Sequence, residues 1–84
     1  MEQKNIPEKT FASGSIVATV WSNHKVNDGK SFEYKTVSLQ RRYTDGSGTW
    51  KGTSSLRLND LPKAELLLKE AYKYLVFKDK DGAS

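Results

Sequence analysis

The 84-residue sequence contains no cysteine and a single histidine, His24. Without cysteine the chain can form neither a disulfide nor a thiolate metal site, and one histidine is too few for a zinc site. His24 lies among turn-forming residues, where we expect an exposed loop side chain. We therefore predict no metal and no cofactor, and the lack of cysteine suits a reducing compartment such as the cytoplasm.

Catalytic motifs are also missing. The sequence has no GxSxG, HExxH, P-loop or dinucleotide-binding pattern. Its carboxylates fall mostly on the polar face of a predicted helix or near the chain ends, so we expect no pair of them to converge in a cleft for general acid–base catalysis. We predict a binding protein rather than an enzyme, with no small-molecule substrate.

Long apolar runs are absent as well. No segment approaches the roughly 20 apolar residues of a membrane-spanning helix. The first ten residues, MEQKNIPEKT, lack the apolar core of a signal peptide. These absences predict a soluble cytoplasmic protein without membrane contact, associated with the nucleoid if the source is prokaryotic.

Positive charge is present, and it is concentrated in the middle of the chain. The net charge is +4 at pH 7, and the whole excess lies in residues 30–57, which also hold all three arginines. Residues 1–29 and 58–84 are each neutral overall. A polyanion is the simplest partner for a segment with this charge.

The stretch from Lys30 to Thr44, KSFEYKTVSLQRRYT, alternates in character and predicts one long central strand with two faces. Val37 and Leu39 are its expected contribution to the core. The opposite parity forms an aromatic and hydrogen-bonding outer surface: Phe32, Tyr34, Ser38, Gln40 and Arg42.

Two more strands are predicted beside this one. Residues 15–21, SIVATVW, should turn Ile16, Ala18 and Val20 inward and Trp21 outward. In residues 49–58, TWKGTSSLRL, one parity is apolar and the other is polar. We expect Trp50, Leu56 and Leu58 to point inward, and Lys51, Thr53, Ser55 and Arg57 to join the outer surface.

Turn-forming segments separate these strands. Residues 22–29 end in Asp-Gly and residues 45–48 read DGSG, so both should close antiparallel hairpins. A fourth strand would have to come from residues 10–14 or from a partner chain.

A helix follows the strands. Asn59, Asp60 and Pro62 are typical of a helix start, and the helix should run from about Leu61 to Phe77. Its apolar arc spans about 160°, which is wider than one thin sheet face requires. Either the sheet curls around the helix, or the helix also packs on a second copy of itself. We favour the homodimer, with an interface that contains Leu67, Ala71, Tyr74 and Leu75.

The sequence therefore predicts an α+β protein in which a curved antiparallel sheet of three to four strands precedes one C-terminal amphipathic helix. Residues 11–78 form a single β-β-β-α domain, residues 1–10 a flexible arm, and residues 79–84 a polar tail.

The predicted ligand is single-stranded nucleic acid, because stacking rings suit unpaired bases and cations suit phosphates. Single-stranded DNA is favoured over RNA and over duplex DNA, with low sequence specificity and a role in transcription, replication or repair. Parity and charge together give the predicted site: Trp21, Phe32, Tyr34, Lys35, Ser38, Gln40, Arg41, Arg42, Lys51, Thr53, Ser55 and Arg57. Two alternatives stay open, a duplex-binding three-stranded sheet and a protein-interaction module that binds no nucleic acid.

The stretches SIVATVW, FEYKTVSLQRRY and TWKGTSSLRLNDLPKAELLLKEAYKYLV, with the turns between them, cover residues 15–76. Their layout resembles the single-stranded-DNA-binding superfamily of positive cofactor four, Whirly and the Pur-alpha repeats. The resemblance implies four strands before the helix, protomers paired through their helices, and nucleic acid lying across the sheets. The lysine-rich motif of the Whirly proteins has no counterpart in this chain, so no residue role is carried over. The segment SSLRLNDLPKAELLLKEAYKYLV is also similar to small uncharacterised prokaryotic proteins.

Overall fold

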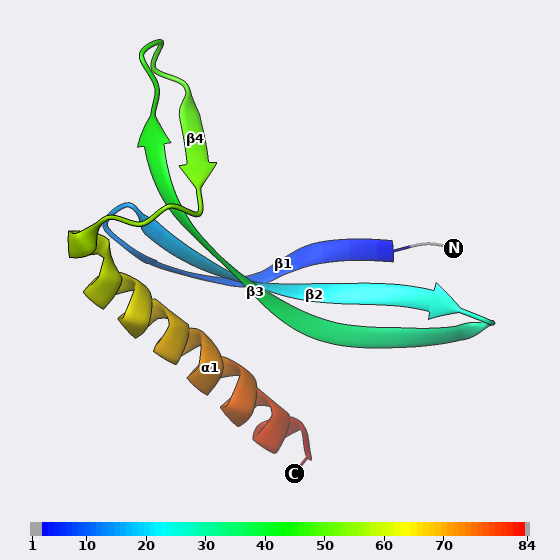
Figure 1. Ribbon diagram of the computed structural model, residues 1–84. Helices are drawn as coiled ribbons and strands as arrows, with labels where there is room; N and C mark the ends of the chain where they lie inside the picture. The colour runs from blue at the N-terminus through cyan, green and yellow to red at the C-terminus, as the bar shows by residue number, and fades with distance from the viewer. Residues whose placement is uncertain (1–2, 84) are drawn as a thin grey trace.

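The computed structural model describes residues 3–83, with side chains placed for residues 5–78. One antiparallel sheet has the strand order β1-β2-β3-β4, and α1 crosses one of its faces (Figure 1). The predicted α+β architecture is thus confirmed, with four strands. The elements in chain order are β1 (Gln3–Ser13), β2 (Ile16–Asn27), β3 (Lys30–Thr44), β4 (Trp50–Thr53), the 3-10 helix η1 (Leu58–Asp60) and α1 (Leu61–Ala83).

The fourth strand is β1, and it begins well before the predicted residues 10–14. It pairs with β2 from Gln3 opposite Lys25 to Ser13 opposite Ile16, so the prediction of a flexible arm was wrong for residues 3–10. Residues 1–2 of that arm lie outside the described residues. Residues 3–10 form a strand because the long edge of β2, which is distant in the sequence, presents backbone N–H and C=O groups that need hydrogen-bond partners. Proline is tolerated here because β1 is an edge strand and Pro7 adjoins a bulge.

The hairpin of β2 and β3 carries the sheet side of the core. Ala18 lies opposite Leu39 and Val20 opposite Val37, and Ile16, Ala18 and Val20 are fully buried, as their parity predicted. β2 continues to Asn27, so most of the predicted 22–29 loop is strand. The turn itself is Asp28 and Gly29, whose φ angles of 54° and 74° are the left-handed values that Asp-Gly hairpin turns adopt.

The helix packs on this hairpin through a narrow stripe of small and branched side chains. Ala64 and Leu67 join Ile16 and Ala18 in one buried cluster. The first turn is held by Asp60, whose carboxylate accepts the backbone N–H of Arg57 at 2.8 Å.

The helix is longer than predicted. It continues beyond Phe77 to Ala83, so the backbone of residues 79–83 is helical and not an irregular tail. The side chains of these residues lie outside the described set. No proline or glycine interrupts residues 63–81, and the polar residues among them are compatible with helix.

The strand predicted over residues 49–58 is much shorter, because β4 ends at Thr53. Its side chains also point to the opposite sheet faces from those predicted. Lys51 lies opposite Tyr43 and Thr53 opposite Arg41, whereas Trp50 pairs with Thr44. Because cross-strand partners share a sheet face, and a shift of one residue exchanges the faces, Lys51 and Thr53 are on the α1 side and Trp50 is on the other.

The connecting loop explains this register. The Asp45 carboxylate accepts the backbone N–H groups of Ser47 at 2.9 Å and Thr49 at 3.0 Å. These hydrogen bonds lower the pKa of Asp45, and the bond from Thr49 has the largest effect. They fix a loop whose length cannot be deduced from the DGSG letters alone.

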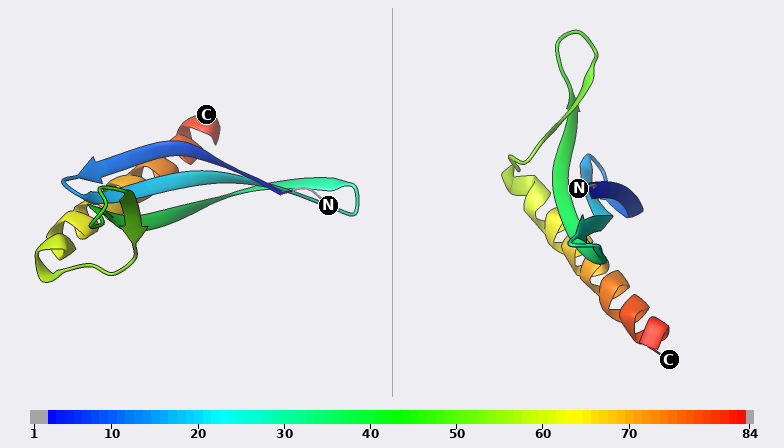
Figure 2. Two further views of the ribbon diagram at one scale, coloured as in Figure 1. Left: turned by 90° about the horizontal axis from the view of Figure 1, so that it is seen from above. Right: turned by 90° about the vertical axis from the view of Figure 1, so that its right-hand side faces the viewer.

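The molecule is open in shape. β3 contributes to two arms, because its first half extends with β2 beyond α1 and its second half forms a separate hairpin with β4 (Figures 1 and 2). The Cα radius of gyration is 15.6 Å, whereas a compact chain of this length gives about 12 Å. The accessible surface is 6286 Å², against roughly 5,050 Å² expected for a folded monomer of this mass.

A charged cluster joins β1, β3 and α1 on the helix side of the sheet. Glu8, at the β1 bulge, accepts hydrogen bonds from Lys35 at 2.6 Å and from the Tyr74 hydroxyl at 2.7 Å, and it also pairs with Lys78. Lys35 contacts Glu33 at 3.0 Å as well. The hydrogen bond from Lys35 is the main cause that lowers the pKa of Glu8 from 4.5 to about 2.

This cluster predicts an acid-sensitive fold. Because the pKa of Glu8 is lowered on folding, its contribution is complete above pH 4.5 and is lost as the pH falls toward 2. We expect Glu8→Gln to lower the free energy of unfolding at neutral pH by about 1–3 kcal/mol and to flatten its pH dependence in that window. Urea denaturation at a series of pH values measures both effects. Glu65→Gln, which removes an exposed carboxylate of α1, is the control, and equal profiles for the two variants would contradict the prediction.

Candidate nucleic-acid interface

The two faces of the sheet differ in charge. Ala18 and its partner Leu39 pack toward α1, so the next pair along, Thr19 and Ser38, points the opposite way. We call this opposite side the outer face. Among the residues whose side chains are described, the outward parity of the four strands contains no aspartate or glutamate. Its larger members are Trp21, Asn23, Lys25, Lys30, Phe32, Tyr34, Gln40, Arg42 and Trp50.

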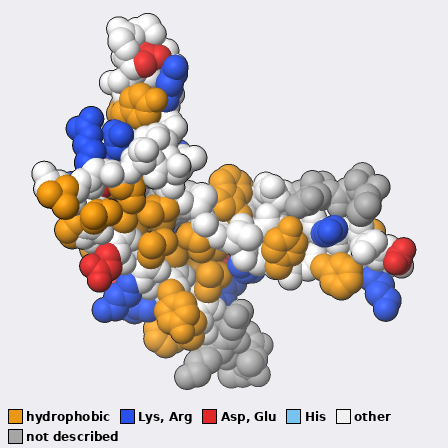
Figure 3. Space-filling model, in the orientation of Figure 1, with side chains coloured by type: hydrophobic (Ala, Val, Ile, Leu, Met, Phe, Trp, Pro, Cys, Tyr) orange, Lys and Arg blue, Asp and Glu red, His pale blue; other side chains and the backbone are white. Residues whose placement is uncertain are grey.

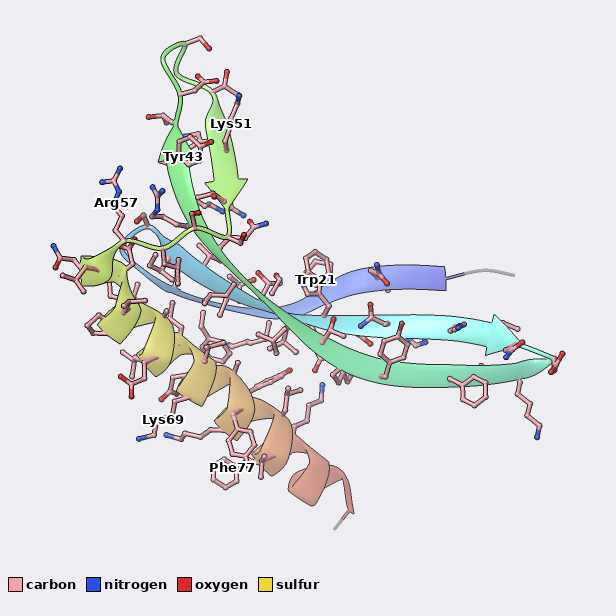
Figure 4. The ribbon with its side chains drawn as sticks, in the orientation of Figure 1. Trp21, Tyr43, Lys51, Arg57, Lys69 and Phe77 are labelled. Carbon is pink, nitrogen blue, oxygen red and sulfur yellow. The ribbon has the colours of Figure 1, made fainter. Side chains whose placement is uncertain are left out.

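Trp21 is held in a fixed position on this face. Its indole N–H donates to the Ser38 hydroxyl at 2.9 Å, and the ring is half-buried. Figure 4 shows it standing on the side of the strands away from α1. Beside it the buried amide of Asn23 donates to Thr36 Oγ1 at 3.0 Å and to the Tyr34 carbonyl at 3.2 Å. These bonds give the face a rigid polar framework.

The free end of the β2–β3 arm carries exposed rings and cations. Phe32 is half exposed and Tyr34 nearly so. Lys25 is the cross-strand partner of Phe32, and Lys30 lies at the turn. Sequence reasoning omitted both lysines from the site. If the alternation of residues 15–21 is continued through residue 27, it places Lys25 on the same face as Trp21 and so in the predicted site.

The other end of the outer face contains Gln40, Arg42 and Trp50. A Cβ atom at Gly52 would lie 2.7 Å from Gln40 Oε1, so glycine is required for the Gln40 side chain to lie across β4. Trp50, predicted to be in the core, is 68% exposed. Its aromatic surface therefore belongs to the outer face. Sequence analysis left Trp50 out of the site because it assigned the residues of β4 to the opposite faces.

Several predicted site residues lie elsewhere. Lys35 belongs to the Glu8 cluster, and Arg41 lies 3.6 Å from the Asp60 carboxylate and donates to the Ser55 carbonyl at 3.2 Å. Both are on the α1 side, as are Lys51 and Thr53, so charge alone was a poor guide to their direction. Lys51 also pairs with Asp45 at 3.3 Å. Ser55 and Arg57 follow the end of β4 and belong to neither strand face.

The residues predicted for a dimer interface are largely used within the monomer. Leu67 and Ala71 are buried against the strands, and Tyr74 is bonded to Glu8. Leu75 is half-buried. The apolar residues that α1 leaves exposed are different ones, and Figure 3 shows hydrophobic side chains gathered over α1 and the adjoining strands. On one flank of the helix they are Leu61, Leu68, Tyr72 and Val76.

The described residues define which chemistry the surface offers. They contain no group of three or more histidine, cysteine, aspartate or glutamate residues placed to hold a metal ion. Within the same residues, no helix combines the length and apolar character needed to span a membrane. The outer face offers flat rings, amides, hydroxyls and cations, which together suit binding of flat and anionic groups. Comparison of the chain with protein-family models, curated proteins and solved structures gives no match.

Proposed function

We propose that this protein binds single-stranded nucleic acid, preferably DNA, across the outer face of its sheet. The observation that carries the proposal is the composition of that face, where exposed rings and cations occur together and the described strand residues contribute no carboxylate. Phosphates are attracted to such a surface, and nothing on its strands repels them.

The chemistry of the face suits unpaired bases. Phe32 and Tyr34 can each stack on a base, with a contribution of roughly 1–3 kcal/mol per base. Lys25 and Lys30 lie at the same end of the face as these rings and can contact the backbone between the bases, and Arg42 can contact a phosphate at the other end. Stacking makes few demands on base identity, so low sequence specificity follows. A cytoplasmic role in transcription, replication or repair would use such binding.

Duplex binding is less well supported. Flat rings are useful where bases can leave the stack and are of little use in a duplex groove. The cations of the free arm are lysines, which lack the bidentate fork with which arginine reads guanine edges.

We also propose that the protein acts as a homodimer through the flank of α1. An excess of roughly 1,200 Å² over the surface expected for a monomer exceeds the roughly 800 Å² per partner of a stable interface. The exposed flank of Leu61, Leu68, Tyr72 and Val76 runs along the helix and has no covering partner among the described residues. A second copy supplies the same apolar stripe, and the outer face stays free in both protomers.

The binding proposal predicts that labelled oligothymidylate binds at 50 mM salt and weakens at 200 mM, with a log–log slope of about −0.7 per phosphate contacted. Phe32→Ala should lower the affinity by about tenfold through lost stacking. Phe77→Ala is a matched control, because Phe77 is 53% exposed and Phe32 is 50% exposed, but Phe77 projects from α1 (Figure 4). Fluorescence anisotropy measures these affinities.

The same titration separates the alternatives. Tighter binding to a duplex of equal length would replace this proposal with groove recognition. Binding to none of the oligonucleotides by a folded protein would leave the outer face as a surface for docking another protein. Equal losses from Phe32→Ala and Phe77→Ala would contradict the placement of the site.

A further inference from the structure

A hollow lies at the base of the β3–β4 hairpin, beside the turn that joins β1 to β2. All three arginines of the chain line it, together with Trp50, Tyr43 and Gly14 among others. Arg57 projects beside the base of the hairpin in Figure 4. The two elements that flank the hollow are tied together, because the Arg42 backbone N–H donates to the Ser15 carbonyl at 2.8 Å.

The three arginines do not have the same role. Arg41 is engaged with Asp60 and the Ser55 carbonyl, and its guanidinium lies 5.6 Å from the centre of the Tyr43 ring. Arg42 and Arg57 have no carboxylate within ion-pairing distance among the described residues. Arg41 therefore helps to hold the structure, while two guanidinium groups remain available to an anion.

The surroundings of this pair add further positive charge and a ring. A Cβ atom at Gly14 would lie 3.1 Å from Lys63 Nζ, which places a fourth cation at the rim of the hollow. Trp50, whose ring is largely exposed, lines the same hollow. Guanidinium groups bind phosphate oxygens in a bidentate manner, and an indole face stacks on a base.

We propose that this hollow is an anchoring subsite for one nucleotide of the bound strand. Arg42 and Arg57 hold its phosphodiester group, and the adjoining base stacks on Trp50. The subsite deepens the proposed function and rests on it. The tightest contact then lies at the base of the β3–β4 hairpin. The free end of the β2–β3 arm, with Phe32 and Tyr34, binds a more distant part of a longer nucleic-acid strand.

The test compares a short with a long strand. Labelled tetrathymidylate and a 16-residue oligothymidylate are titrated into the wild type, Trp50→Ala, the pair Arg42→Gln with Arg57→Gln, and Phe32→Ala. Lys69→Gln is the charge control, because Lys69 projects from α1 away from the sheet (Figure 4). Anisotropy gives the affinities, and the indole N–H resonance of Trp50 reports contact with the tetramer. Circular dichroism confirms that each variant is folded.

We expect Trp50→Ala and the double arginine variant each to weaken the 16-mer at least tenfold and to abolish measurable tetramer binding. The double variant should also lower the salt slope by about 0.7, which is the one phosphate contact that the two arginines share. Phe32→Ala should weaken only the 16-mer, and Lys69→Gln should bind both strands nearly as the wild type does. A shift of the Trp50 resonance with tetramer supports the same conclusion.

The outcomes separate this subsite from the function on which it rests. If Phe32→Ala weakens the 16-mer while the hollow variants bind like Lys69→Gln, the subsite is refuted and the outer-face proposal stands. If the wild type binds neither strand, the proposed function fails and the subsite fails with it. An unchanged Trp50 resonance at saturating tetramer refutes the stacking contact.

Discussion

Leu67→Ala is expected to lower the free energy of unfolding by about 2–5 kcal/mol, as buried leucine-to-alanine changes do. Leu67 is only 4% exposed and packs with Ile16, Ala18 and Ala64 in a buried apolar cluster between sheet and helix. A small domain has a total stability of about 5–15 kcal/mol, so the variant should be unfolded for a measurable fraction of the time at 37 °C. Urea denaturation followed by circular dichroism measures the loss.

The neighbouring residue provides the control. Leu68 is 45% exposed, and Leu68→Ala removes the same atoms from a position about 100° further around the helix. Its effect on the unfolding of a monomer should be below about 1 kcal/mol, as for most exposed positions. If the two variants lose equal stability at low protein concentration, the orientation of α1 on the sheet is wrong.

The second large effect concerns the proposed homodimer. Leu68→Glu combined with Tyr72→Glu should convert the dimer into a monomer and raise the self-dissociation constant at least about 1,000-fold, because unpaired carboxylates in an apolar interface cost several kcal/mol each. Sedimentation velocity over a range of protein concentrations measures this change. The monomeric variant should keep its affinity for tetrathymidylate, since the flank and the outer face are separate.

Leu66→Glu is the matched control for this prediction. Leu66 is an exposed leucine of the same helix, but at 100° per residue it lies far around the helix from Leu68 and Tyr72. It should leave the dimer intact. A wild-type protein that sediments as a monomer at 100 μM, or a Leu66→Glu variant that dissociates like the double variant, would contradict the proposed interface.

Much of the fold can be predicted from local patterns in the sequence. Alternation identified the inward residues Ile16, Ala18 and Val20, and Asp28-Gly29 identified the hairpin turn. The cap at Asp60 and the apolar period located the helix. In the candidate site, the same alternation placed Phe32 and Tyr34 on the outer face. These features follow from neighbours along the chain, whose side-chain directions repeat with a fixed period.

Other features depend on contacts that the sequence pattern does not encode. Residues 3–10 are polar and contain a proline, and they form a strand only because the edge of β2 is available to pair with them. The charge of Lys35 suggested a ligand contact, yet the β1 bulge brings Glu8 to it and satisfies that charge within the fold. Which cations remain for a ligand was therefore decided by strand pairing.

The register of β4 shows most clearly what the sequence determines and what only the tertiary structure decides. The sequence by itself determined that residues 49–53 alternate and follow a turn, and that the helix carries more apolar surface than one sheet face can cover. Only the tertiary structure decided that Trp50 faces outward, that Leu67 is buried while Leu68 is exposed, and that Arg42 and Arg57 share one hollow. The physical reason is that a period of two specifies two faces without stating which is inside. The loop bonds of Asp45 and the packing of α1 make that choice.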